Sequence, residues 1–331
     1  MKKTLKVILS LACVVALVAS LGVGALAVTD EEFEQLKLDT QRALDIQAVE
    51  NIMNRHVLYH CYGEHIEEME EIWVQDPVNQ ATASFGQNQG YYVGYDAIYE
   101  AYAAGHWNNW LSSAKRFCQN NGIDVSGMTD DEIIDAYGGV GQLLLHVTTT
   151  AIIEIAADGK TAKGYWYSPG MIAESGSSAN SIWEAYGCDF VKENGEWKMW
   201  HLHMFTDFMC QFGDTFTGSN AGGGSGGPSG EGSGEPAANA GQEHYEGEGG
   251  NVLYHAGLIE SGNYDPATTH DYLYSTQYTE FSHDRLRADM EIFLPTAYDT
   301  WSFDDGNYGP TAAEWQSIGV DLDAWYAAHS N

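Results

Sequence analysis

The order of the periodic segments limits what this chain can fold into. Apolar residues recur at spacings of three and four within 33–62 and 66–73, as they do along one face of a helix. From residue 142 onward the rhythm changes to β-branched and aromatic runs, separated by the hairpin-turn pairs Asp158-Gly159 and Asn194-Gly195. Helices followed by an antiparallel meander define the α+β class, so we expect a curved antiparallel sheet wrapped by N-terminal helices.

The individual elements follow from the same patterns. Thr129 and Glu132 have the spacing of a capping box, which predicts a small helix inside the otherwise polar and irregular segment 105–141. The expected helices span 33–62, 66–73, 95–104, 129–137 and 312–328, and the expected strands lie within 81–93, 143–156, 161–167, 181–192 and 196–205.

The N-terminus has the pattern of a secretory signal peptide over residues 1–27. Three lysines precede an apolar run that reaches Val23, and Ala25-Leu26-Ala27 has the form of a cleavage site. We therefore expect a secreted or cell-surface protein with no stable membrane insertion after cleavage. An uncleaved membrane anchor is the alternative, because the run is at the short limit of a spanning helix.

The rest of the chain divides by composition into three parts. Residues 28–217 carry the helix and strand patterns, whereas 218–250 is rich in Gly, Ser and Glu and predicts a flexible linker. Residues 251–331 regain aromatics without sustained periodicity. A segment of this size and irregularity would make a marginal core of its own, so we expect a long irregular C-terminal extension that packs on the first domain.

Charge and cysteine usage narrow the functional classes. Forty-seven acidic residues against fourteen Lys and Arg give a formal net charge of −33, which repels phosphate backbones and excludes nucleic acid as an expected partner. Cys61, Cys118, Cys188 and Cys210 lack the spacing of a zinc motif, and their disulfide pairing stays open. A homo-oligomer is also left open.

Two histidines lie on the apolar stripe of the first long helix. His56 and His60 share a face with Val49, Ile52 and Met53. Burying a polar ring without a partner costs about 1–3 kcal/mol, so either a polar cavity or a hydrogen-bond network must receive these rings. His65 comes after the helix-breaking Gly63, and we expect it to face solvent.

Three pieces of the chain together resemble a known family. They are the helix 48–64, the strand pair 146–155 with 158–162, and the strands 186–191 and 195–199. Over about 41–208 the chain resembles the SnoaL-like group of the nuclear transport factor 2-like superfamily. The resemblance implies a cone of curved antiparallel sheet with a deep pocket, in a group that includes cyclases, dehydratases, ketosteroid isomerases and plain binding proteins.

The resemblance also implies site positions. In dehydratase-like members the first helix presents a tyrosine and, five residues later, an aspartate, and these positions fall on His56 and Cys61. The strand histidine of the family matches His146, and its basic residue on the last strand matches His201 or His203. Another pocket acid is replaced by Cys188, so the usual aspartate bases are missing.

We therefore expect histidine acid/base chemistry. His146 is the candidate acid or base, His56 would orient a substrate oxygen, and His203 would assist. Each of these histidines has a purely structural alternative, a hydrogen bond in the core. The candidate substrate-binding residues are His60, Cys61, Tyr186, Trp166 and His201.

The predicted function is that of a cofactor-independent lyase (dehydratase) or isomerase acting on a hydroxylated aromatic or polycyclic small molecule. Catalytically inert binding of a small molecule or carbohydrate is one alternative, and a cell-surface interaction protein is another. SnoaL-like pockets usually hold no metal, so none is expected. A site formed by His56 and His60 together with His201 and His203 is the metal-binding alternative.

Overall fold

The computed structural model describes residues 29–87, 90–174, 179–211, 251–254 and 294–330. The chain divides into two compact units, 1–44 and 45–331, and each is considered by itself. The predicted signal peptide and linker lie outside the described residues. Within the described ranges, no helix combines the length and apolarity needed to cross a membrane.

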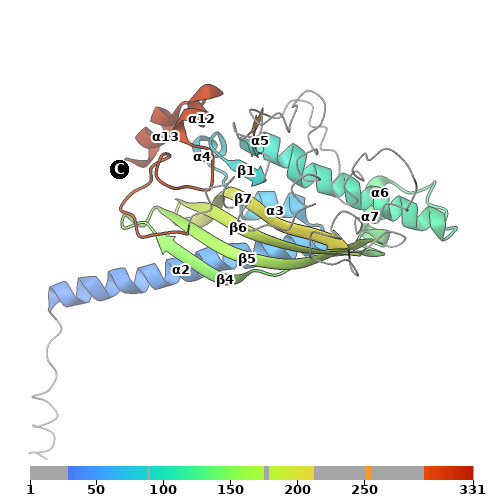
Figure 1. The fold of residues 1–331 in the computed structure, drawn as a ribbon, viewed down its shortest axis with the longest axis horizontal. Helices are drawn as coiled ribbons and strands as arrows, with labels where there is room; N and C mark the ends of the chain where they lie inside the picture. The colour runs from blue at the N-terminus through green and yellow to red at the C-terminus, as the bar shows by residue number, and fades with distance from the viewer. Residues whose placement is uncertain (1–28, 88–89, 175–178, 212–250, 255–293, 331) are drawn as a thin grey trace, which may run out of the picture. The chain divides into compact units, whose positions relative to one another are not determined.

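The first unit contributes the leading half of one long helix, and all other described elements belong to the second unit (Figure 1). The helices are α2 (Asp30–Tyr62), α3 (His65–Glu71), α4 (Pro77–Gln80), α5 (Tyr95–Ile98), the π-helical η1 (Tyr99–Ala104), α6 (Gly105–Asn120), α7 (Asp130–Tyr137), α12 (Ala312–Ser317) and α13 (Leu322–His329). The helices predicted at 33–62, 66–73, 95–104 and 129–137 are confirmed, including the capping box of Thr129 and Glu132.

Two helix predictions are wrong. Residues 105–120, expected to be irregular, form α6, which buries Leu111, Ala114 and Cys118 at spacings of three and four. The single helix expected at 312–328 is split into α12 and α13, because Gly319 takes a positive φ of 82° between them.

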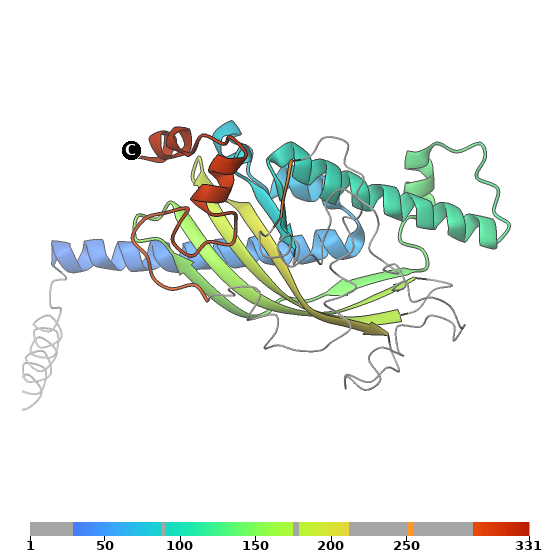
Figure 2. The same ribbon diagram turned by 45° about the horizontal axis from the view of Figure 1, so that its top comes forward.

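Among the described residues, eight strands form one sheet. They are β1 (Ser84–Gln87), β2 (Gly90–Val93), β3 (Gln142–His146), β4 (Thr149–Ile155), β5 (Thr161–Glu174), β6 (Ala179–Glu193), β7 (Glu196–Gln211) and β8 (Asn251–Tyr254). Their order is β3-β5-β6-β7-β1-β2-β8, and β4 also pairs with β5. The sheet is open and curved (Figure 2), so the predicted α+β class is confirmed.

Two details of the sheet differ from expectation. The predicted strand 143–156 is two strands, β3 and β4, which pair with different parts of β5. Within β4 the register shifts between Thr149 and Ile152, where Thr150 has a φ of +54°. The sheet is also not fully antiparallel, since β1 runs parallel to β7. No hairpin joins these two strands, so no tight turn fixes their relative direction.

The two faces of β6 have different neighbours. Tyr186 and Cys188 face α2, where the Cys188 thiol lies 3.4 Å from the Met53 sulfur. Gly187 and Asp189 point the other way, as alternation along a strand requires, toward Tyr308 in the C-terminal segment. The α2 face therefore carries one set of polar groups and the C-terminal face another.

The described C-terminal residues 294–330 contact the rest of this unit closely. Trp301, Phe303, Trp315 and Trp325 belong to the same apolar core as α2 and the central strands. The indole of Trp325 donates a hydrogen bond to the Asn79 side chain over 2.9 Å. These aromatics cover the sheet face opposite to α2.

Candidate functional site

A network of buried polar side chains occupies the space between α2, α3, η1 and the sheet. Its centre is Glu68 on α3, whose side chain has no exposed surface. One carboxylate oxygen accepts hydrogen bonds from His56 Nδ1 at 2.8 Å and Trp73 Nε1 at 3.1 Å, and the other accepts from the Tyr102 hydroxyl at 2.7 Å. A hydrogen-bond network thus receives His56, which was one of the two expected solutions.

Glu68 was not among the predicted site residues. It lies three residues after His65 and next to Met69, on the face of α3 that is buried. Its position on the same face as His65 was the sequence signal for burial. An acidic residue in an acidic helix is nevertheless expected to be exposed to solvent until its hydrogen-bond partners are known.

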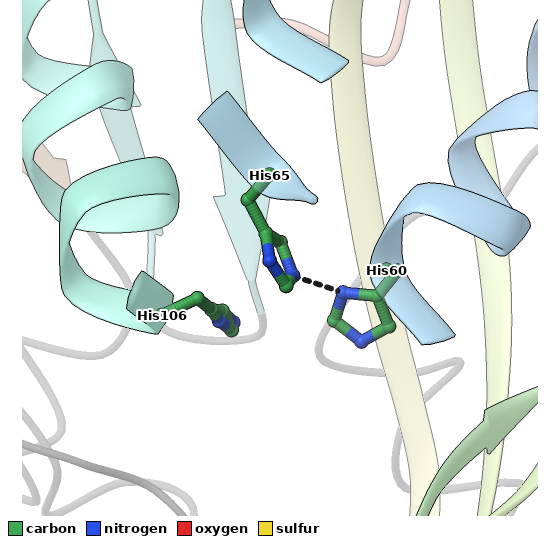
Figure 3. Close-up of side chains that lie close together, drawn as sticks. All are labelled: His60, His65 and His106. Atoms are coloured by element: carbon green, nitrogen blue, oxygen red, sulfur yellow. Dashed lines mark hydrogen bonds between the residues drawn. The ribbon is translucent and has the colours of Figure 1, made fainter. Parts of the chain in front are cut away.

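Three histidines from three helices meet beside this network. His60 Nδ1 lies 2.8 Å from His65 Nε2, and the ring centre of His106 lies 4.1 Å from that of His65 (Figure 3). His65 is only 1% exposed, so the expectation that it faces solvent is wrong. Gly63, with a φ of +77°, turns the chain so that α3 begins on the same buried side on which α2 ends.

The surroundings of the three histidines keep their rings neutral. Burial, together with the neighbouring imidazoles of His65 and His146, holds the pKa of His60 well below its ordinary value. Burial and the His106 ring do the same for the pKa of His65. Loss of hydration lowers the pKa of His106 to about 3. At neutral pH each ring therefore offers one nitrogen lone pair.

His146 ends β3 beside a second buried carboxylate. Its Nδ1 lies 3.3 Å from Glu184 Oε2, within ion-pair distance but without hydrogen-bond alignment, and the His146 side chain is 3% exposed. The Tyr186 hydroxyl donates to the same Glu184 oxygen over 3.0 Å. The rings of His146 and His60 are 5.1 Å apart, so this pair adjoins the histidine cluster.

Sequence reasoning did not identify Glu184. It lies two residues before Tyr186 on the same face of β6, and that period of two was the signal available. Burial raises the pKa of the Tyr186 hydroxyl well above its ordinary value, and the Glu184 charge adds to this, so the hydroxyl stays protonated as a donor.

The other predicted residues on this side fall into two groups. Cys61 is half-buried and its sulfur lies 3.4 Å from the backbone nitrogen of His146, while Tyr186 packs edge-on to His56 with ring centres 5.5 Å apart. Trp166 instead belongs to the apolar core, edge-on to Phe190 at 6.1 Å. His56, His60, Cys61, His146 and Tyr186 are therefore brought together.

His201 and His203 lie on the opposite face of the sheet. The two ring nitrogens of His201 lie 2.8 Å from Asp189 Oδ2 and 2.9 Å from the Thr82 carbonyl oxygen. His203 Nε2 lies 3.0 Å from the Gln87 carbonyl oxygen, and its ring stacks on Phe205 at 4.0 Å. The structure does not bring either residue to His146.

The predicted metal-binding alternative is wrong for the same reason. It needs the pair on α2 and the pair on β7 to face one another, but the sheet lies between them. The Asp189 and Thr82 contacts also occupy both nitrogens of His201.

Gly63 is the residue that allows the histidine helices to approach one another. A Cβ atom at this position would lie 2.7 Å from the Trp110 ring of α6, and the positive φ disfavours any side chain. We expect Gly63→Ala to lower the free energy of unfolding by about 1–3 kcal/mol, as overpacking does.

Chemical denaturation measures this change. Gly122→Ala is the matched control, because Gly122 has a φ of +67° but nothing within 4 Å of an added Cβ. The Gly122→Ala variant therefore measures the cost of the strained backbone alone, which is about 1 kcal/mol of stability. Equal losses in the two variants would contradict the packing argument.

One small hollow lies away from these groups. Its lining residues are Ser113, Arg116, Phe117, Asn120, Asn121, Val140, Gly141 and Gln142, and its volume is about 30 Å³. A hollow of this volume holds only a few water molecules and is too small for an aromatic ligand.

The fold and the site define a class: an α+β protein whose curved sheet and first helices enclose buried histidines and carboxylates. Residues 131–203 match the family model of the SnoaL-like domain. This stretch contains α7 and β3 to β6, and with them His146, Glu184 and Tyr186. The match over these residues agrees with the resemblance to the SnoaL-like group that was read from the sequence.

Solved structures similar to this chain include a putative scytalone dehydratase from Novosphingobium aromaticivorans, at 12% identity over 53% of this chain and 91% of that one, with a TM-score of 0.36. A hexachlorocyclohexane dehydrochlorinase from Novosphingobium barchaimii has 12% identity over 53% and 94%, with a TM-score of 0.37. A protein from N. aromaticivorans described as nuclear transport factor 2-like, with a cystatin-like fold, has 16% identity over 54% and 91%, with a TM-score of 0.34. No curated protein matches the chain.

Proposed function

We propose that this protein is a lyase or isomerase that uses His146 to move protons on a hydroxylated aromatic or polycyclic small molecule. The observation that carries the proposal is the placement of His146 Nδ1 3.3 Å from a buried carboxylate, Glu184, inside the SnoaL-like segment. A histidine that only ended a strand would not need a buried acid beside it.

The carboxylate gives the imidazole two properties of an acid/base catalyst. It favours the tautomer with the proton on Nδ1, which leaves Nε2 with the lone pair, and it stabilises the imidazolium that forms when Nε2 accepts a proton. The Tyr186 hydroxyl fixes the Glu184 oxygen from the other side. His146 can therefore take a proton from carbon and return it.

This one group can support both reaction types. In a dehydration, Nε2 takes the proton from a carbon, the carbon–carbon double bond forms, and the C–O bond breaks as the imidazolium protonates the departing hydroxyl to water. In an isomerisation, the imidazolium returns the same proton to a different carbon. Neither route needs an oxidant, a reductant or a co-substrate.

The neighbouring residues have supporting roles in this proposal. Cys61, at the position of the family's aspartate, contacts the His146 backbone and fixes the end of β3. His56 is held by Glu68 and acts as a positioning residue rather than as a second base. His201 and His203, on the far face, take no part in the proton transfer.

A specific observation favours a second candidate, a binding protein without turnover. Glu68 is satisfied on both oxygens by His56, Trp73 and Tyr102, which is the arrangement of a structural network. On this account the resemblance still implies a small-molecule ligand, but His146 and Glu184 stabilise the fold rather than catalyse a reaction.

Turnover of a compound panel separates the two candidates. The full chain is incubated with hydroxylated aromatic and polycyclic compounds, with loss of water followed by mass spectrometry and double-bond migration by ultraviolet absorbance. We expect the wild type to turn over at least one compound and His146→Ala to be slower by about 10²–10⁴-fold.

His329→Ala is the matched control, since it removes a histidine on α13 and should leave the rate unchanged. Equal rates for His146→Ala and the wild type would end the acid/base proposal. Binding of panel compounds without turnover of any of them would favour the binding protein.

A further inference from the structure

We propose that His60, His65 and His106 bind a divalent first-row transition-metal ion, with Zn²⁺ the best fit. The three side chains come from the last turn of α2, the first residue of α3 and the first turn of α6, and they point toward one another (Figure 3). One ligand nitrogen from each lies within 4.8 Å of the other two.

The donor set fits this class of ion. Imidazole nitrogen is a preferred ligand of zinc, copper, nickel and iron, whereas calcium and magnesium prefer oxygen. A tetrahedral zinc site with bonds of about 2.0–2.1 Å places its ligand nitrogens a little over 3 Å apart. The 2.8 Å between His60 Nδ1 and His65 Nε2 needs an opening of only a few tenths of an ångström to reach this spacing.

The rings also have the required protonation state. A metal ligand must be the neutral imidazole, which is the form that most histidine side chains take at neutral pH. Without an ion, His60 Nδ1 and His65 Nε2 share one hydrogen bond over 2.8 Å, which a bound ion would replace with two metal–nitrogen bonds. A bound ion would be coordinated by the nitrogen lone pairs that point into the cluster.

Residues around the cluster support it without competing for the ion. The Tyr102 ring lies 4.9 Å from His65 and 5.1 Å from His106, and its hydroxyl is 3.4 Å from His60 Nδ1. This hydroxyl donates to Glu68, whose oxygens are already engaged. Because its hydrogen bond to Glu68 is much shorter, at 2.7 Å, Tyr102 can give up the 3.4 Å contact with His60 Nδ1 to an ion.

The three residues differ in exposure. His60 and His65 are buried, and His106 has intermediate exposure. Three protein ligands with a remaining position are typical of sites that bind a water or a substrate oxygen. His146 lies 5.1 Å from His60, so such an oxygen would be near the proposed acid/base group; this last step alone rests on the proposed function.

Zinc binding to the full chain tests the site. The purified protein is stripped with a chelator and titrated with Zn²⁺ by calorimetry in the presence of a weak competing chelator, which removes ions held loosely by the many surface carboxylates. We expect one tight equivalent in the wild type. His65→Ala and His106→Ala should each weaken it by more than about 100-fold, because even outer partners of metal ligands account for 10–100-fold.

His329→Ala is the matched control and should bind as the wild type does. Circular dichroism checks the folding of each variant. If His65→Ala unfolds, His106→Ala is the deciding variant, because His106 is the least buried of the three residues. Co²⁺ substitution gives a second readout: an intense tetrahedral visible spectrum is expected in the wild type and not in His106→Ala. No tight equivalent, or equal affinity in wild type and His106→Ala, would overturn the proposal whatever the turnover results.

Discussion

Replacing Glu68 by alanine should lower the free energy of unfolding by about 3–5 kcal/mol, the range found when one partner of a buried polar network is removed. The substitution leaves His56 Nδ1, Trp73 Nε1 and the Tyr102 hydroxyl without their common acceptor. Each buried donor that loses its partner costs about 1–3 kcal/mol, and the three losses partly overlap because the side chains can relax together.

Urea denaturation of paired variants measures this effect. Glu67→Ala is the control, since Glu67 is the neighbouring acid on α3 and is exposed; it should change stability by less than about 0.5 kcal/mol. Glu68→Gln keeps the shape and one acceptor oxygen and should fall between the two. A loss for Glu68→Ala no larger than that for Glu67→Ala would mean that the network contributes little to the fold.

Periodicity predicted most of the helices and strands that have one buried face and one exposed face. The stripe of α2 is such a case, because burial of Val49, Met53, His56 and His60 repeats with the helix. The segment of α6 was missed although apolar residues recur at helical spacing there, because the Asn, Ser and Gly residues around them suggested an irregular segment. The apolar residues are Trp107, Trp110, Leu111, Ala114, Phe117 and Cys118.

The candidate site was only partly predictable because it depends on long-range contacts. The family pattern pointed to His146 and His56, but Glu68 and Glu184 look like ordinary acids in an acidic sequence until their donors are placed around them. His65 was misjudged because a glycine that ends a helix can reverse the chain onto the same buried side. The period of a helix does not predict the direction that the chain takes after such a turn.

The histidines of β7 show a further limit. The spacing of two in His201 and His203 correctly places both on one face of a strand, but it does not say which face. Only the pairing of β6 with β7, with Asp189 beside His201, assigns them to the side of the C-terminal segment. The spacing of residues within each histidine pair therefore could not predict whether the pair on α2 and the pair on β7 lie close together.

His146 and Glu184 should behave as one catalytic unit. If the carboxylate acts by orienting and stabilising the imidazole, its loss has no further effect once the imidazole is gone. Glu184→Gln retains an acceptor for Tyr186 and nearly the same volume, so it tests the charge rather than the packing. Glu196→Gln, at an exposed position at the start of β7, is the matched control.

The most direct test is a double-mutant cycle on kcat, using a compound turned over by the wild type. We expect His146→Ala to lower kcat by about 10²–10⁴-fold and Glu184→Gln to lower it substantially. The double variant should be no slower than His146→Ala, with KM little changed throughout. Losses that multiply in the double variant, or a normal kcat in Glu184→Gln, would contradict the claim that this buried pair is the catalytic centre.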